Sequence, residues 1–135
     1  MDKLVKGRNA NVKPIVFVVD DEVGYTDIMR DVLEQYGLEV HISNGAFEAM
    51  QIMGWMTPDL ILLDIMMPSV DGITLLRHLR RDQNMPKIPI LVVSAHPETR
   101  EEALAAGADG YLAKPFTAQE LRSTISQYVE VSPQA

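Results

Sequence analysis

Short runs of apolar residues alternate along this chain with longer stretches in which apolar residues recur at helical spacing. Three of the runs read IVFVV, LILL and ILVV, and they are continuously apolar, without alternating polar positions. Continuous runs rich in Val and Ile are typical of parallel strands that are covered by helices on both faces. We therefore predict five strands, over residues 15–20, 38–43, 59–63, 88–93 and 110–113.

Apolar stripes and end signals mark the helices between these strands. Gly37 and Gly107 each follow a stripe, where glycine favours the end of a helix, and Thr117 suits an N-cap. The predicted helices cover residues 24–36, 46–56, 72–82, 98–106 and 118–129, and the first two stripes include Ile28, Phe47, Met50 and Trp55. Five repeats of strand then helix predict an α/β fold with a doubly wound parallel sheet.

Composition narrows the class of protein. A chain of 135 residues is the length of one domain, and the absence of cysteine excludes a disulfide framework, a zinc–thiolate site and a cysteine nucleophile. No apolar run approaches the length of a membrane span, and the N-terminus lacks the apolar core of a secretory signal, so we expect a cytoplasmic protein without membrane contact.

Charge is unevenly distributed. The net charge is -7, yet residues 1–14 contain Lys3, Lys6, Arg8 and Lys13 against the single acid Asp2. An acidic body suits a phosphate backbone poorly, so we expect no direct nucleic-acid binding. The basic segment is interpreted as a mobile terminus, with contact to an acidic partner as the alternative.

Polar side chains follow the ends of four predicted strands. The first strand runs into Asp20 and Asp21, the third into Asp64, the fourth into Ser94 and the fifth into Lys114. In an open parallel sheet, ligands bind outside the carboxyl ends of the strands. If the first and third strands are neighbours, the three aspartates form one cluster.

That combination indicates phosphoryl chemistry. Clustered carboxylates repel one another, and a hard divalent cation such as Mg²⁺ neutralises them with oxygen ligands. A carboxylate beside the cation can act as a nucleophile and form an acyl phosphate. Lys114 would supply positive charge to the phosphoryl oxygens and Ser94 a hydrogen bond. Each residue alone is more often structural, as a turn, cap or surface charge, but all of them together at strand ends favour function.

The chain resembles the receiver domain of bacterial response regulators over about residues 14–129. The stretches IVFVVDDE, LILLDIMMPSVDG, ILVVSA and GADGYLAKPF carry the resemblance. It implies a flavodoxin-like fold, a five-stranded parallel sheet in the order 2-1-3-4-5 with helices on both faces. It leaves a basic N-terminal tail, residues 1–13, and a C-terminal tail, residues 130–135. We expect a stand-alone, chemotaxis-regulator-like domain whose output comes through a downstream protein partner.

The resemblance also implies roles for single residues. Asp64 resembles the phosphoacceptor, and Asp20, Asp21, Asp64 and the backbone carbonyl of Met66 resemble the ligands of Mg²⁺ (or Mn²⁺). Ser94 and Lys114 match the residues that contact the phosphoryl group, Ser94 and Tyr111 match the switch pair, and the Lys114–Pro115 bond is expected to be cis.

A signalling role follows from the same resemblance. A histidine kinase or histidine phosphotransfer protein would donate the phosphoryl group, and the surface of the fourth helix, fifth strand and fifth helix would change. The domain would catalyse its own phosphorylation and slow autodephosphorylation but would not turn over external substrates. A monomer or weak homodimer is expected.

Three other classes fit less well. A phosphatase of the haloacid dehalogenase type needs a second aspartate two residues after the nucleophile, where this chain has Met66. A flavin-binding module needs a phosphate-binding loop after the first strand, where Asp20 and Asp21 would repel phosphate. A phosphorylation-independent pseudo-receiver would lack acidic or lysine residues that this chain retains.

Overall fold

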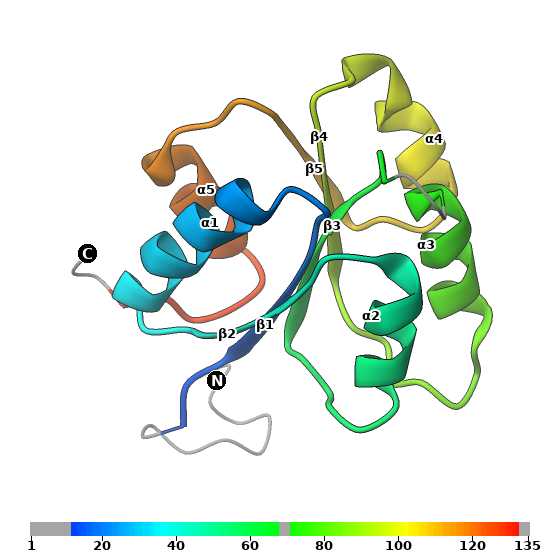
Figure 1. Ribbon diagram of the computed structural model, residues 1–135, viewed down its shortest axis with the longest axis horizontal. Helices are drawn as coiled ribbons and strands as arrows, with labels where there is room; N and C mark the ends of the chain where they lie inside the picture. The colour runs from blue at the N-terminus through cyan, green and yellow to red at the C-terminus, as the bar shows by residue number, and fades with distance from the viewer. Residues whose placement is uncertain (1–11, 68–70, 133–135) are drawn as a thin grey trace.

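The computed structural model describes residues 12–67 and 71–132 (Figure 1). A five-stranded sheet lies at its centre, with the strands in the order β2-β1-β3-β4-β5. All neighbouring strands pair in parallel. The strands are β1 (Ile15–Val19), β2 (Glu39–Ser43), β3 (Leu60–Asp64), β4 (Ile90–Ser94) and β5 (Gly110–Ala113). The predicted fold class and strand order are therefore confirmed.

Helices cover both faces of the sheet. In Figure 1, α1 and α5 lie on one side of the strands and α2, α3 and α4 on the other. The helical elements are α1 (Val23–Gln35), α2 (Ala46–Met53), α3 (Gly72–Arg81), the 3₁₀ turn η2 (Pro97–Thr99), α4 (Arg100–Ala105) and α5 (Ala118–Ile125). None of the helices within the described residues is long and apolar enough to cross a membrane.

Each face of the sheet has its own core. Val16 and Val18 of β1 pack with the α1 and α5 residues Met29, Leu33 and Leu121. Phe17 and Val19 point to the other face and pack with residues of α2, α3 and α4. Alternate residues of one strand thus enter opposite cores, which explains why the strand sequence is continuously apolar.

Some helix predictions are wrong in detail. The second helix ends at Met53, before the predicted residue 56, and the last ends at Ile125, before residue 129. Ile28 is 63% exposed because the buried face of α1 consists of Thr26, Met29 and Leu33. The predicted stripe of α2 is also largely turned outward, since Phe47 and Trp55 are 68% and 72% exposed.

The end signals are confirmed. Gly37 and Gly107 both have positive φ, 84° and 115°, a conformation that costs glycine least. Thr117 caps α5 in a capping box, in which its side chain accepts a hydrogen bond from the Glu120 N–H and Glu120 accepts one from the Thr117 N–H. Both devices fix where the helices start and stop relative to the strands.

The side chain of Arg80 ties α3 to the amino end of the sheet. The guanidinium of Arg80 donates hydrogen bonds of 2.8 Å to the carbonyls of Gly107 and Ile88 and pairs with Asp109. Asp109 also accepts a hydrogen bond from the Ile90 N–H at the start of β4. The amino ends of β4 and β5 are therefore held to the end of α3.

The two predicted tails fall largely outside the described residues, which exclude 1–11 and 133–135.

Candidate functional site

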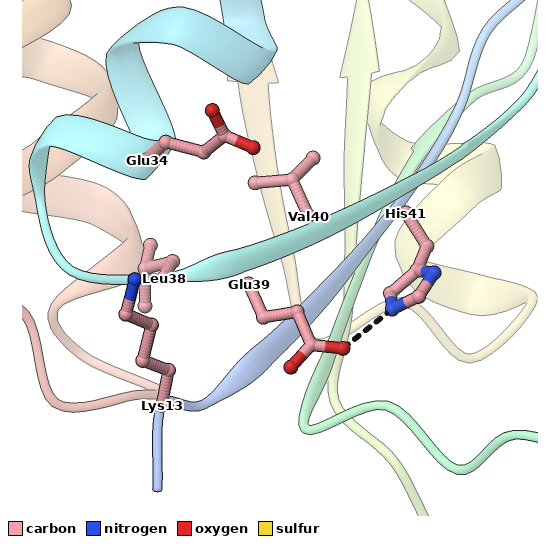
Figure 2. Close-up of a pocket in the computed structure, with 6 residues that line it drawn as sticks. All are labelled: Lys13, Glu34, Leu38, Glu39, Val40 and His41. Carbon is pink, nitrogen blue, oxygen red and sulfur yellow. Dashed lines mark hydrogen bonds and ion pairs between the residues drawn. The ribbon is translucent and has the colours of Figure 1, made fainter. Parts of the chain in front are cut away.

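One pocket lies at the amino end of the sheet, where β2 begins (Figure 2). In it, His41 and Glu39 approach each other, with 2.7 Å between Nε2 and Oε2. The lining residues are Lys13, Glu34, Leu38, Glu39, Val40 and His41. Charges of both signs alternate there with aliphatic side chains, and the described part of the chain has no group of three metal ligands at this end.

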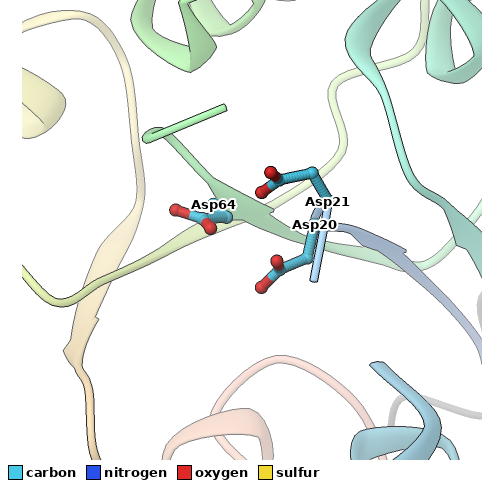
Figure 3. Close-up of side chains that lie close together, drawn as sticks. All are labelled: Asp20, Asp21 and Asp64. Carbon is cyan, nitrogen blue, oxygen red and sulfur yellow. The ribbon is translucent and has the colours of Figure 1, made fainter. Parts of the chain in front are cut away.

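The predicted aspartates gather at the opposite, carboxyl end. Val19 of β1 is in register with Leu63 of β3, so Asp20 and Asp64 leave adjacent strands side by side. Carboxylate oxygens of Asp20, Asp21 and Asp64 all lie within 4.8 Å of one another (Figure 3). The adjacency that the sequence left open is thereby established.

Local hydrogen bonds orient two of these carboxylates. Oδ1 of Asp20 accepts a 3.0 Å bond from the Glu22 N–H, and Oδ1 of Asp64 accepts one of the same length from the Met66 N–H. Both side chains are almost fully buried, at 2% and 5% exposure. Asn44 donates a further hydrogen bond to the backbone carbonyl of Asp20. The second oxygen of each carboxylate, Oδ2, lies near the ammonium of Lys114.

Lys114 supplies the positive charge. Its Nζ lies 2.9 Å from Oδ2 of Asp20, 3.4 Å from Oδ2 of Asp64 and 3.5 Å from Oε1 of Glu22. The Lys114 N–H donates to the carbonyl of Ser94, which fixes the end of β5 against β4. The Lys114–Pro115 bond is cis, as the resemblance implied.

Burial and neighbouring charges shift the pKa values of Asp64 and Lys114. Burial raises the pKa of Asp64 and the charge of Asp20 adds to this, against the opposing effects of the Met66 N–H and Lys114. Burial alone would lower the pKa of Lys114, but its hydrogen bond to Asp20 and the charges of Asp64 and Asp20 outweigh burial and raise it. Lys114 therefore stays protonated.

One ammonium group leaves negative charge uncompensated among the three aspartates. Their oxygen donors are the type that Mg²⁺ and Mn²⁺ bind, and among the described residues they are the one group of three acidic or histidine side chains close enough to hold a metal. The residues present therefore fit a hard divalent cation.

A pocket of about 240 Å³ opens beside the aspartates. Its volume is several times that of one water molecule, which leaves room for a group of phosphoryl size. Met66, whose side chain is half exposed, and His96 form part of its wall. The full lining consists of Asp21, Glu22, Asp64, Met66, Ala95, His96 and Lys114.

The two predicted switch residues lie next to this pocket without lining it. Ser94 is fully buried, and its hydroxyl oxygen accepts a 3.0 Å hydrogen bond from the His96 N–H. The Tyr111 hydroxyl donates a 2.8 Å hydrogen bond to the His96 carbonyl. Both residues are thus bonded to the backbone of His96, in the loop after β4.

Sequence reasoning missed two neighbours of Lys114. Glu22 enters the sequence analysis only as the last residue of the stretch IVFVVDDE, and Tyr25 is not singled out at all. Tyr25 is the third residue of α1, in the turn that directly follows the aspartates, and this nearness in sequence is the signal for its place beside the site. The ammonium of Lys114 lies over its ring, 4.3 Å from the centroid.

Comparison with known proteins identifies one family and a set of relatives. Residues 16–126 match the model of the response regulator receiver domain family. The phosphate regulon transcriptional regulatory protein PhoB of Rhizobium meliloti is 38% identical over 114 residues, which are 83% of this chain and 50% of that protein. The chain spans about half or less of the length of its curated relatives.

Solved structures are similar over nearly the whole described fold. The chemotaxis response regulator CheY4 of Vibrio cholerae has a TM-score of 0.81 at 28% identity. The match covers 87% of this chain and 100% of that chain. The receiver domain of the sensor histidine kinase PA1611 of Pseudomonas aeruginosa has a TM-score of 0.79 at 27% identity, covering 87% and 98%. That structure has a magnesium ion coordinated in its active site cleft.

Proposed function

Because this chain belongs to the response regulator receiver domain family of two-component signalling systems, we propose that it is switched by phosphorylation of Asp64. The observation that carries the proposal is that the buried Asp64 carboxylate lies close to two other aspartates and to the ammonium of Lys114. A carboxylate nucleophile, an oxygen-donor set for a cation and a fixed positive charge are the parts that phosphoryl transfer to aspartate needs.

The donor is a phosphohistidine of a histidine kinase or histidine phosphotransfer protein. An oxygen of Asp64 attacks the phosphorus, the phosphorus–nitrogen bond breaks, and the histidine leaves with the bond's electron pair. Asp20, Asp21, Asp64 and the Met66 carbonyl would hold Mg²⁺ (or Mn²⁺), which when bound supplies positive charge to the phosphoryl oxygens. Burial raises the pKa of Asp64, so the reaction requires the carboxylate to be kept ionised by the surrounding positive charge.

Lys114 and Ser94 stabilise the product. The Lys114 ammonium already spans Asp20 and Asp64, so a small movement brings it onto a phosphoryl oxygen. The Ser94 hydroxyl oxygen accepts a bond from the His96 N–H, so its own hydrogen can be donated to another phosphoryl oxygen when the side chain moves toward it. Since Tyr111 is bonded to the carbonyl of the same residue, His96, this movement passes to β5.

The output is a changed surface. Movement of Ser94 and Tyr111 alters the face formed by α4, β5 and α5, and a downstream protein partner recognises the altered face as a population shift between two states. The domain catalyses its own phosphorylation and a slow autodephosphorylation and does not turn over external substrates. It acts as a monomer or weak homodimer.

Phosphorylation by a small donor tests the proposal without the kinase. The protein is incubated with phosphoramidate and Mg²⁺ and examined by intact mass spectrometry. We expect one added phosphoryl group on the native protein and none on Asp64→Asn. Asp31→Asn, an exposed aspartate of α1, is the matched control and should be phosphorylated normally. Equal phosphorylation of Asp64→Asn would refute the assignment.

A further inference from the structure

The Lys114 ammonium has two kinds of contact. Carboxylate oxygens of Asp20, Asp64 and Glu22 lie within 3.5 Å of it. The ring of Tyr25 faces it as well, with 4.3 Å between Nζ and the ring centroid. An ammonium within about 6 Å of an aromatic centroid is attracted by the negative face of the ring.

Tyr25 also contacts the turn that carries the lysine. Its ring meets that of Phe116 edge to face, with 5.8 Å between centroids and 78° between planes. Phe116 follows Lys114 by two residues, so a single side chain of α1 contacts both the Lys114 ammonium and a side chain of the turn after β5. This aromatic contact joins segments that are about 90 residues apart in sequence.

The ring is the part of Tyr25 that acts. Within residues 12–67 and 71–132 its buried hydroxyl has no hydrogen-bond partner. A buried hydroxyl without a partner costs free energy, so it does not explain why an aromatic residue occupies this place. The face of the ring contributes the attraction to Lys114, and its edge contributes packing.

We propose that Tyr25 is a positioning residue for phosphoryl transfer, because its ring holds the Lys114 ammonium where a phosphoryl oxygen of Asp64 binds. The inference rests on the proposed function of Asp64 and Lys114. The carboxylates attract the ammonium without fixing the direction of its approach. Asp21 and Asp64 would also have to bind the cation. The ring offers a contact that neither cation nor phosphoryl group competes for, so Lys114 keeps one fixed contact while its polar partners change.

A first experiment tests the contact itself. In the native protein the ring current of Tyr25 should shift the Lys114 side-chain resonances upfield, in a spectrum recorded without metal or phosphodonor. Tyr25→Phe should keep that shift and Tyr25→Leu should lose it. Lys114 resonances at their random-coil positions in the native protein would refute the contact.

A second experiment separates the electrostatic role from packing. Phenylalanine, difluorophenylalanine and pentafluorophenylalanine are placed at position 25, because fluorine depletes the ring face of charge while the size changes little. We expect the initial rate of Mg²⁺-dependent phosphorylation to fall in that order, with pentafluorophenylalanine and Tyr25→Leu about three- to thirtyfold slower than phenylalanine. Melting temperatures should vary little across the fluorinated series.

Tyr36 provides the matched control. Its ring faces the guanidinium of Arg122, 5.5 Å from the centroid, far from the aspartates. Pentafluorophenylalanine at position 36 should leave the phosphorylation rate unchanged. If the native protein is phosphorylated normally but the phosphorylation rate does not change across the fluorinated series at position 25, this inference alone is overturned. A native protein that accepts no phosphoryl group overturns the proposed function, and this inference with it.

Discussion

The Tyr111 hydroxyl donates a 2.8 Å hydrogen bond to the backbone carbonyl of His96, and this bond connects β5 to the loop after β4. The N–H of His96 donates a hydrogen bond to the hydroxyl oxygen of Ser94. A phosphoryl group that draws the Ser94 hydroxyl away would break its bond to the His96 N–H, while the Tyr111 hydroxyl would still be bonded to the His96 carbonyl. We therefore expect transmission to the face of α4, β5 and α5 to depend on the Tyr111 hydroxyl.

We predict that Tyr111→Phe weakens this transmission. A phosphoryl mimic bound to the native protein should shift amide resonances from the pocket through about residues 97–129. In Tyr111→Phe the pocket shifts should remain, and the distal shifts should shrink. Tyr128→Phe is the control, because its hydroxyl bonds the Asp109 carbonyl in the same region but away from Ser94. Native shifts confined to the pocket would contradict the switch.

The second prediction concerns Asp21. Asp21→Ala should abolish Mg²⁺-dependent phosphorylation, since it removes one of the three carboxylates that lie within 4.8 Å of one another. Relief of like-charge repulsion should raise the metal-free unfolding free energy by on the order of 1 kcal/mol. Added Mg²⁺ should raise the melting temperature of the native protein but not of the variant. Asp27→Ala, at an exposed position of α1, should behave as native in both assays.

The third prediction concerns the lifetime of the phosphorylated state. Met66 is half exposed in the pocket wall and has no strong hydrogen-bonding group with which to orient a water molecule. Autodephosphorylation should therefore be slow, and Met66→Asn or Met66→Glu should accelerate it several-fold by positioning the attacking water. Decay is followed by mass spectrometry at fixed Mg²⁺, with Met50→Asn on α2 as the control. Decay no faster in either variant would show that Met66 does not set the lifetime.

The sequence predicted the strands and the site better than the helix faces. Continuous apolar runs identify strands without regard to which way each residue points, because both faces of this sheet are buried. Ile28 and Phe47 were misplaced because their helices have apolar residues on more than one side, and only packing selects the side that meets the sheet. Asp20 and Asp64 could be placed together once strand order was known, since strand ends share one edge.

The contacts of long side chains could not be predicted in this way. No spacing rule says how far Lys114 reaches, so its bonds to Asp20 and Glu22 and its position over Tyr25 required the structure. Arg80 gave no signal either, because a basic residue in the last turn of a helix is usually solvated.

Arg80 is the subject of the fourth prediction. Arg80→Met should lower the unfolding free energy by roughly 2–4 kcal/mol, because it leaves Asp109 and the carbonyls of Gly107 and Ile88 without their donor. Phosphorylation chemistry should persist, since the contacts of Arg80 lie at the other end of the strands. Urea denaturation measures the loss. Arg81→Met, at the neighbouring exposed position, should cost little, and equal losses in the two variants would contradict this role of Arg80.

The fifth prediction concerns alkaline pH. Burial raises the pKa of Tyr25 from 10.0 to about 12, although the charge of Lys114 opposes the shift. The unfolded chain then loses this proton at lower pH than the folded protein does. Tyr25 therefore contributes stability that is complete below pH 10 and is lost as pH rises toward 12.

The unfolding free energy of the native protein should fall across that range, and in Tyr25→Phe it should fall less steeply. Urea denaturation at a series of pH values, with tyrosinate absorbance recorded in parallel, checks this. Burial and Asp109 also raise the pKa of Tyr128, so Tyr25→Phe/Tyr128→Phe should flatten the slope further. A slope unchanged in Tyr25→Phe would contradict the buried position of its hydroxyl.

The hydrogen bond between Lys114 and Asp20 joins residues separated by 94 positions, and every strand pairing between them is parallel and non-local. Pairings of this kind form late, because the intervening chain must first be ordered. A chain still emerging from the ribosome, or one in which β5 has not docked, has carboxylates but no lysine beside them. On the proposed function, we therefore expect competence to accept a phosphoryl group only once β5 has docked, so that a brief pulse of phosphodonor would label folded molecules and pass over immature ones.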